Sequence, residues 1–146
     1  MPDMNPIQSI CDEVLARGRG SRVTLRLSAE LAVRYESLAP GIHSLTGPSP
    51  IDLEKQPVPI EIRKGNQVVQ DNCAACFPEQ PLFHEMLAHY GTPGRPMSAQ
   101  IVTPVVKDGA VLGALSLHVL GGPRAWTADD GAMCTDACAR IAVLLP

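Results

Sequence analysis

The chain has 146 residues, a formal net charge of −3, and 45% hydrophobic against 18% charged residues. This length predicts one domain with a single core, and the composition carries no signature of disorder. The mild acidity argues against a duplex-binding protein. Aromatic residues make up only 3% of the chain, too few for a platform on which single-stranded bases could stack. We therefore expect a folded domain, 1–146, with an aliphatic core and no nucleic-acid partner.

Neither a membrane span nor a secretory signal is expected. The longest apolar runs, such as Ala110 to Leu117, fall far short of the ~20 residues that a bilayer span needs. The N-terminus lacks a basic segment followed by an apolar one. We expect a cytoplasmic protein with no membrane partner, and we interpret its five cysteines first as thiols or metal ligands and only second as disulfides.

The first third of the chain predicts a helix followed by a hairpin. Alternation over residues 22–27 and a similar pattern over 31–37 predict two paired strands. Clustered prolines and glycines over 39–59 predict a loop with a short ordered piece near Ile42. Residues 1–20, which precede this hairpin, predict an amphipathic helix that ends at a glycine, either Gly18 or Gly20. Its apolar residues recur at helical spacing: Ile7, Ile10, Cys11, Val14 and Leu15.

The remainder predicts a helix, a second hairpin and a last helix. Residues 60–64 fit a helical turn or a strand, residues 67–70 fit an extended segment, and 73–99 form an irregular stretch around one helix over 82–90. Asp108-Gly109 lies between apolar runs over 101–106 and 111–119, which predicts a tight hairpin. Thr127, followed by acidic residues, predicts the start of a helix within 127–146.

This order of elements predicts an α+β fold, with an antiparallel sheet and both terminal helices on one face. Alternation assigns an apolar face to the helices: Val23, Leu25, Leu27, Leu115 and Leu117. The opposite face is mixed: Thr24, Arg26, Arg34, Glu36, Ser116 and His118. Either solvent covers the mixed face, or the middle segment folds over it and encloses a partly polar cavity. The length of the irregular segments favours the cavity.

The C-terminal third contains a proline strand at Thr103-Pro104-Val105, a turn at Gly109, a second strand with Gly113, and then Trp126-Thr127-Ala128-Asp129-Asp130. This succession resembles the end of a GAF domain. Residues 22–27, Glu36, Gly41 and 69–71 also stand where small bacterial GAF proteins have similar residues. The resemblance covers essentially the whole chain, and its motifs belong to the scaffold rather than to one activity.

The resemblance implies a central antiparallel sheet of five or six strands, terminal helices on one face, and a small-molecule pocket under loops on the other. GAF domains bind cyclic nucleotides, bilins, haem, 2-oxo acids or aromatic compounds, and they often form homodimers through the terminal helices. We therefore expect a sensory module that binds a small organic ligand, has no enzymatic activity of its own, and signals through a separate effector protein. The sequence by itself requires no cofactor and names none. The bilin-attachment context and the cyclic-nucleotide signature Asn-Lys-x-Phe-Asp-Glu are absent in recognisable form.

Cys73-Ala74-Ala75-Cys76 leaves three interpretations open. A Cys-x-x-Cys pair can be a redox couple, half of a metal site, or two thiols without chemistry. The free methionine sulfoxide reductases of the GAF family use pocket cysteines, so a thiol-based redox enzyme or sensor is the alternative function, although their surrounding motifs are missing. A metal- or haem-binding module that also uses His84 and His89 is a further alternative. Cys11, Cys134 and Cys138 fit the packed core.

Arg26 is expected either to bind a ligand carboxylate through its planar fork or to form a cross-strand ion pair with Glu36. His118 is either a pocket residue or a hydrogen-bonded core histidine. Trp126 and Arg124 are expected to be structural. We predict no catalytic residue, no metal ligand and the following ligand-binding residues: Arg26, Glu36, Asp71, Cys73, Cys76, His84, Tyr90, Ser116 and His118.

Overall fold

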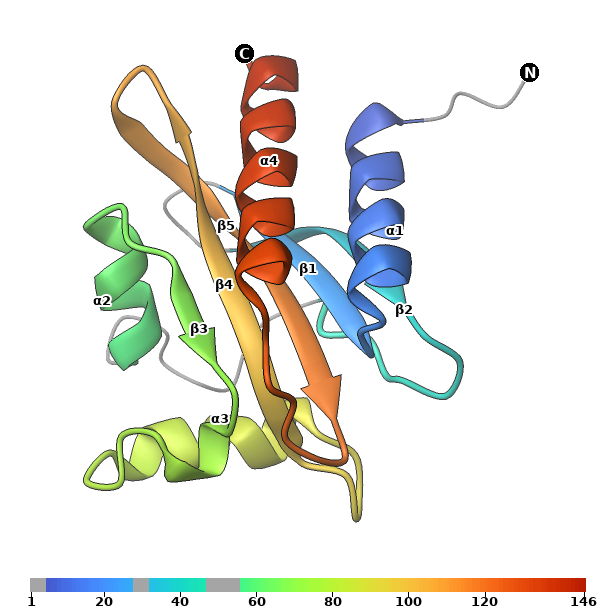
Figure 1. Ribbon diagram of the computed structural model, residues 1–146, viewed down its shortest axis with the longest axis vertical. Coiled ribbons are helices and arrows are strands. Elements are labelled where there is room, and N and C mark those ends of the chain that lie inside the picture. The colour runs from blue at the N-terminus through green and yellow to red at the C-terminus, as the bar shows by residue number, and fades with distance from the viewer. Residues whose placement is uncertain (1–4, 28–31, 47–55) are drawn as a thin grey trace.

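The computed structural model describes residues 5–27, 32–46 and 56–146, and within them one five-stranded sheet lies between two pairs of helices (Figure 1). The strand order is β2-β1-β5-β4-β3, and all neighbours are antiparallel. The elements are α1 (Pro6–Gly18), β1 (Arg22–Leu27), β2 (Ala32–Leu38), α2 (Pro57–Arg63), β3 (Val68–Gln70), the 3-10 turn η2 (Cys73–Ala75), α3 (Pro81–Tyr90), β4 (Met97–Lys107), β5 (Ala110–Leu120) and α4 (Ala128–Leu144).

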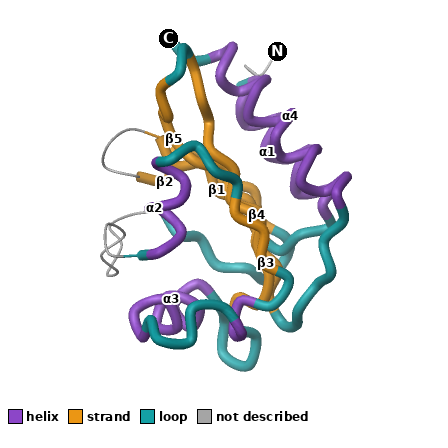
Figure 2. Tube along the Cα trace, turned by 60° about the vertical axis from the view of Figure 1, so that its left-hand side comes forward, coloured by secondary structure: helices purple, strands orange, loops and turns teal. Residues whose placement is uncertain are grey.

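The two faces of the sheet support two separate apolar clusters. Helices α1 and α4 cover one face, and α2 and α3 lie on the other (Figure 2). Val23, Leu25 and Leu117 are fully buried under the terminal helices. Phe83 and Met97 belong to the second cluster, beneath the middle segment. The α+β prediction with both terminal helices on one face is confirmed. No helix in the described parts of the chain is long and apolar enough to cross a membrane.

Helix α1 does not end as the sequence suggested. The residue in the left-handed conformation is Arg19, with φ of 48°, and neither Gly18 nor Gly20 takes that role. A Cβ at Gly18 or Gly20 would lie 2.7 or 2.5 Å from a methyl carbon of Leu117. The two glycines are therefore needed for the close approach of the chain to β5, and the turn itself is closed by backbone hydrogen bonds from Arg19.

The loop predicted over 39–59 is shorter than expected, because α2 begins at Pro57. Proline is tolerated in the first turn of a helix, where its missing N–H would have no partner within the helix. The ambiguous segment 60–64 is therefore mostly helical, whereas Ile42 is buried without belonging to a helix or strand. The predictions for residues 28–31 and 47–55 lie outside the described residues.

The hairpin between β4 and β5 turns at Asp108 and Gly109, which both have positive φ, of 52° and 78°. Two such residues in succession match the tight turn that the Asp-Gly pair predicted. Thr127 caps α4: its hydroxyl accepts from the N–H of Asp130, and the Asp130 carboxylate accepts from the N–H of Thr127. Both local predictions are confirmed, and the two strands extend further than their apolar runs indicated.

Replacing Gly113 with alanine should destabilise the sheet. A Cβ at this position would lie 2.1 Å from the carbonyl oxygen of Arg26, so strands β1 and β5 would have to separate. We expect the free energy of unfolding in urea to fall by about 2 kcal/mol or more. Gly131→Ala is the matched control, because its Cβ meets the flexible side chain of Gln67 at 3.2 Å. Equal losses in the two variants would contradict the prediction.

Candidate functional site

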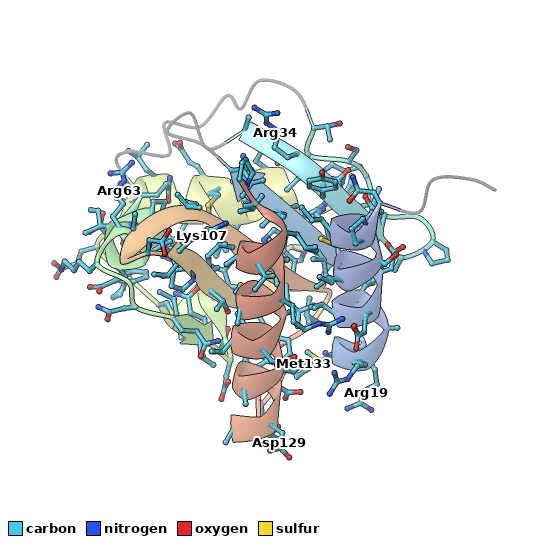
Figure 3. All side chains as sticks on the ribbon, turned by 90° about the horizontal axis from the view of Figure 1, so that it is seen from above. Arg19, Arg34, Arg63, Lys107, Asp129 and Met133 are labelled. Carbon is cyan, nitrogen blue, oxygen red and sulfur yellow. The ribbon has the colours of Figure 1, made fainter. Side chains whose placement is uncertain are left out.

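A cavity of about 500 Å³ lies between the mixed face of the sheet and the helices α2 and α3. Its apolar lining comes from both helices, from the middle of β4 and from β5 near the hairpin turn: Val58, Ile62, Met86, Val102, Val111 and Leu112. Its polar lining comes mainly from the sheet: Thr24, Arg26, Arg63, Gln100, Ser116 and His118. Arg63 is the last residue of α2, and Figure 3 shows it at the side of the molecule, separate from Arg34 on β2. The middle segment covers part of the predicted mixed face, at Thr24, Arg26, Ser116 and His118, and it does so through α2 and α3 where loops were expected. Arg34 and Glu36 lie outside the cavity lining.

Strand register brings the polar residues of the sheet together in two rows. Thr24 pairs with Ser116, and Arg22 pairs with His118, across β1 and β5. On the other side of β5, Gln100 of β4 pairs with His118. Because alternate residues of a strand share a face, both rows face the cavity side of the sheet.

Tyr90 joins the end of α3 to this face. Its ring stacks on His118 with centroids 5.6 Å apart and an interplanar angle of 28°. Its hydroxyl oxygen accepts a hydrogen bond of 3.1 Å from Nη2 of Arg26. Tyr90 itself is buried and lines the cavity, so the aromatic ring fixes α3 over the two polar residues.

Arg22 lies opposite His118 on the neighbouring strand and is fully buried. Its Nη1 donates to the carbonyl oxygen of Tyr90 at 2.9 Å and contacts Nδ1 of His118 at 3.2 Å, and its Nη2 donates to the carbonyl oxygen of His43 at 3.1 Å. Burial lowers the pKa of Arg22 to about 10, partly offset by the nearby Glu36 carboxylate and Tyr90, so the guanidinium stays charged at neutral pH. Burial, with the charges of Arg22 and Arg26, holds the pKa of His118 well below 6.5.

Cys73 and Cys76 lie beside the polar network but do not line the cavity. Gln70 accepts from Nε2 of Gln100 at 2.6 Å, and the Cys73 thiol is 3.7 Å from the same Gln70 oxygen. Burial raises the pKa of Cys73 to about 12, and it also raises the pKa of the half-buried Cys76. Both groups are therefore held as thiols at neutral pH, whereas the thiolate is the reactive form.

Three other predicted ligand residues bind neighbouring backbone groups instead of lining the cavity. Glu36 accepts from the backbone N–H of Leu45 at 2.7 Å, and Asp71 accepts from that of Trp126 at 3.1 Å. His84 lies 3.2 Å from the carbonyl oxygen of Phe77.

The cross-strand partners of Arg26 and Glu36 differ from the expected direct pairing. Glu36 lies opposite Thr24, whereas Arg26 lies opposite Val33, because the register shifts between Leu25 and Arg26.

Four of the predicted ligand residues do line the cavity together: Arg26, Tyr90, Ser116 and His118.

The other cysteines and the Trp126 segment pack as structural groups. Cys11, Cys134 and Cys138 are buried in the cluster beneath α1 and α4. Trp126 donates from Nε1 to the carbonyl oxygen of Gln70 at 3.0 Å, and the Arg124 guanidinium lies 5.1 Å from the centre of its ring. Within the described residues, no three His, Cys, Asp or Glu side chains gather closely enough to hold a metal ion.

The sequence model of the GAF domain matches residues 6–145. The chain belongs to the GAF domain family. No curated protein matches it in sequence.

Solved structures share the fold at low sequence identity. GAF3 from Slr1393 of Synechocystis sp. PCC6803, in its photoproduct state, has a TM-score of 0.72 and 18% identity, covering 96% of this chain and 90% of its own. The PixJ GAF domain of Thermosynechococcus elongatus gives 0.67 and 18%, covering 95% and 84%. The dark state of JSC1_58120g3 with bound biliverdin IXa gives 0.69 and 14%, covering 90% and 82%.

Sequence reasoning missed several cavity residues of this GAF domain. Met86 and Ile62 belong to helices whose cavity-facing side depends on how each helix docks. Gln100 could have been found, because it continues the alternation of a predicted strand toward the mixed face. The same holds for Arg22, which contacts His118 without lining the cavity itself. The burial of a whole arginine could not have been inferred from alternation alone.

The pH dependence of stability should report on His118. Its folded-state pKa is depressed, so below its ordinary value of 6.5 the unfolded chain binds a proton that the folded GAF domain does not. The free energy of unfolding should therefore fall between pH 7 and pH 5, by up to about 1.4 kcal/mol per pH unit for this one group. Urea unfolding at several pH values measures the slope.

His118→Gln should flatten that slope, since glutamine does not titrate. His89→Gln removes an exposed imidazole outside the cavity and serves as the control. A slope that disappears in the His89 variant and persists in the His118 variant would show that His118 is not the group responsible.

Proposed function

We propose that this GAF domain is a sensory module that binds an amphipathic organic anion in the cavity between the sheet and helices α2 and α3. The observation that carries the proposal is the lining of that cavity. It combines an extensive apolar wall with two arginines, Arg26 and Arg63, and the described lining residues include no carboxylate.

The cavity has the size and character of a small-molecule site. Ligand pockets measure about 300–1,000 Å³ and carry a few polar groups on a mostly apolar wall. An apolar body would replace water along Val58, Ile62 and Val102, and an acidic group would offset the arginine charge. Arginine suits this task because its planar fork can hold a carboxylate through two hydrogen bonds.

Biliverdin is a suitable first probe, since it is an extended apolar molecule with carboxylates, and one protein of similar fold has been solved with it. No cysteine is among the described lining residues, so binding here would be non-covalent.

A route from the cavity to the outside of the domain supports a sensory role. Val111 and Leu112 line the cavity on the β4–β5 hairpin, and the ammonium group of Lys107 on the same hairpin donates to the carbonyl oxygen of Leu145, just beyond α4. A ligand that favours one position of the hairpin would favour one position of the end of α4. A separate effector protein would read that change.

The thiol alternative is less well supported. Cys73 is fully buried, its pKa is raised, and neither cysteine of the Cys-x-x-Cys pair lines the cavity. A substrate in the cavity would therefore have no thiol among its described neighbours.

Arginine variants test the proposed ligand class. Biliverdin binding, followed by its absorbance on titration, should weaken about tenfold in Arg26→Met, because a charge-assisted hydrogen bond is lost from a partly buried site. Arg63→Met should cost less, since Arg63 is exposed.

Arg34→Met removes the same charge from an exposed position outside the cavity and should leave affinity unchanged. An equal loss of biliverdin affinity in all three variants would show that the arginines act only through general electrostatic attraction. If neither biliverdin nor the apolar sulfonate dye 8-anilinonaphthalene-1-sulfonate binds the folded protein, the proposed function is wrong.

We also propose that two copies of the chain pair through α1 and α4, as the family resemblance implies. A shallow groove runs between the two helices and is lined by Pro6, Ile10, Val143 and Leu144, with Glu13 and Arg140 beside them. Val143 is 81% exposed, and Leu144 is 43% exposed. A second copy that presents the same apolar surface would cover both side chains.

Light scattering after size exclusion tests this pairing. Val143→Glu should convert a dimer to a monomer, because a carboxylate would be buried without a partner. Val69→Glu changes another exposed valine, on β3, and should leave the mass unchanged. A monomeric parent protein, or a dimer that survives Val143→Glu, would refute pairing through this groove.

A further inference from the structure

The hydrogen-bonding capacity of Arg22 determines which ring nitrogen of His118 carries the proton. A guanidinium has only N–H donors, so the 3.2 Å contact between Arg22 Nη1 and His118 Nδ1 can be a hydrogen bond only if Nδ1 accepts. A neutral imidazole that accepts at Nδ1 carries its proton on Nε2. The second ring nitrogen of His118 is therefore a donor.

That donor faces the ligand side of the fold. His118 is only 2% exposed and lines the cavity. Within the described part of the chain, the one hydrogen-bond contact of its imidazole ring is that of Nδ1 with Arg22, so Nε2 has no acceptor there. An N–H that faces the cavity without a protein acceptor is a position that a ligand oxygen would satisfy.

We propose that Arg22 is a positioning residue that fixes His118 as a hydrogen-bond donor, and that the ligand of this cavity carries an oxygen acceptor, a carbonyl or carboxylate, at its buried end. This inference rests on the proposed function, since it assumes that the cavity holds a ligand. It adds a second recognition point, at His118, to the arginines already described.

Arg22 is itself held in one place. Its other hydrogen bonds go to the carbonyl oxygens of Tyr90, at the end of α3, and of His43, in the segment after β2. The last carbonyls of a helix attract a cation, so the end of α3 is a favourable partner for the guanidinium. With these bonds in place, the guanidinium cannot turn away from His118 without losing buried partners.

The surroundings keep the imidazole neutral. The groups that face or act on it are Arg22 and Arg26 from β1, Tyr90 from α3 and Gln100 from β4, none of which is a carboxylate. The positive charges and the burial lower the pKa of His118, so the donor persists throughout the physiological range. Glu36 acts on Arg22, where it favours the charged form of the guanidinium.

Nitrogen NMR of the unmodified protein tests the positioning directly and needs no ligand. In selectively labelled protein, His118 should show a protonated Nε2 and an unprotonated Nδ1 at pH 7, and the same pattern at pH 5.5. Assignment follows from the loss of the signals in His118→Gln. A proton on Nδ1, or protonation of both nitrogens at pH 7, would overturn the proposal.

Two matched acids test the acceptor. Fluorenone-2-carboxylate and fluorene-2-carboxylate differ by one ketone oxygen, and calorimetry should show the ketone binding at least about five-fold more tightly. The preference should vanish in His118→Phe and return in part in His118→Gln, which restores an N–H donor. It should survive Ser116→Ala, which removes a neighbouring hydroxyl on the same strand.

The outcomes separate this inference from the proposed function. If neither acid binds, the anion-binding function loses support, while the NMR result still decides whether Arg22 positions His118. If both acids bind with equal affinity, the function stands and the acceptor is refuted. If the preference depends on Ser116 instead of His118, the donor has been wrongly assigned.

Discussion

One buried guanidinium connects the elements that enclose the cavity. Arg22 is fully buried, and its donors reach the end of α3, the segment after β2, and the middle of the sheet at β5. Removing such a charge from water is costly unless every donor finds a partner. Here carbonyl oxygens and an imidazole nitrogen contact all three guanidinium nitrogens. The position of α3 over the sheet, and therefore the shape of the cavity, depends on this set of bonds.

The sheet separates structural stability from ligand recognition. On one face, Val23, Leu25 and Leu117 pack against the terminal helices. On the other, Thr24, Ser116 and His118 occupy the intervening positions of the same strands. A one-residue slip of β5 would exchange the two sets and destroy both the core and the site. The close approach of β1 at Gly113 leaves no room for a side chain, which helps to hold the correct register.

The separation of the two sheet faces explains which features of the structure could be predicted from the sequence. Alternation and turn chemistry depend on neighbouring residues, so the strands, the Asp-Gly hairpin, the Thr127 cap and the covered mixed face were all predictable. Glu36, Asp71 and His84 were assigned to the site from their residue types, yet their partners are Leu45, Trp126 and Phe77, in segments whose placement no local pattern determines. The contribution of α2 and α3 to the cavity was hidden for the same reason.

The net charge of the whole chain does not predict the charge around the cavity. A formal charge of −3 suggests a protein that repels anions, but five of the fifteen acidic residues lie on the terminal helices, across the sheet from the cavity: Asp12, Glu13, Asp129, Asp130 and Asp136. Glu61 on α2 and Glu85 on α3 are on the cavity side but do not line the cavity. The cavity side carries Arg22, Arg26 and Arg63, with no carboxylate in the described lining. Charges that are partly removed from water act more strongly on a bound ligand than distant exposed charges, which salt screens. Local burial of arginine, rather than total charge, therefore sets the preference of this site for an anion.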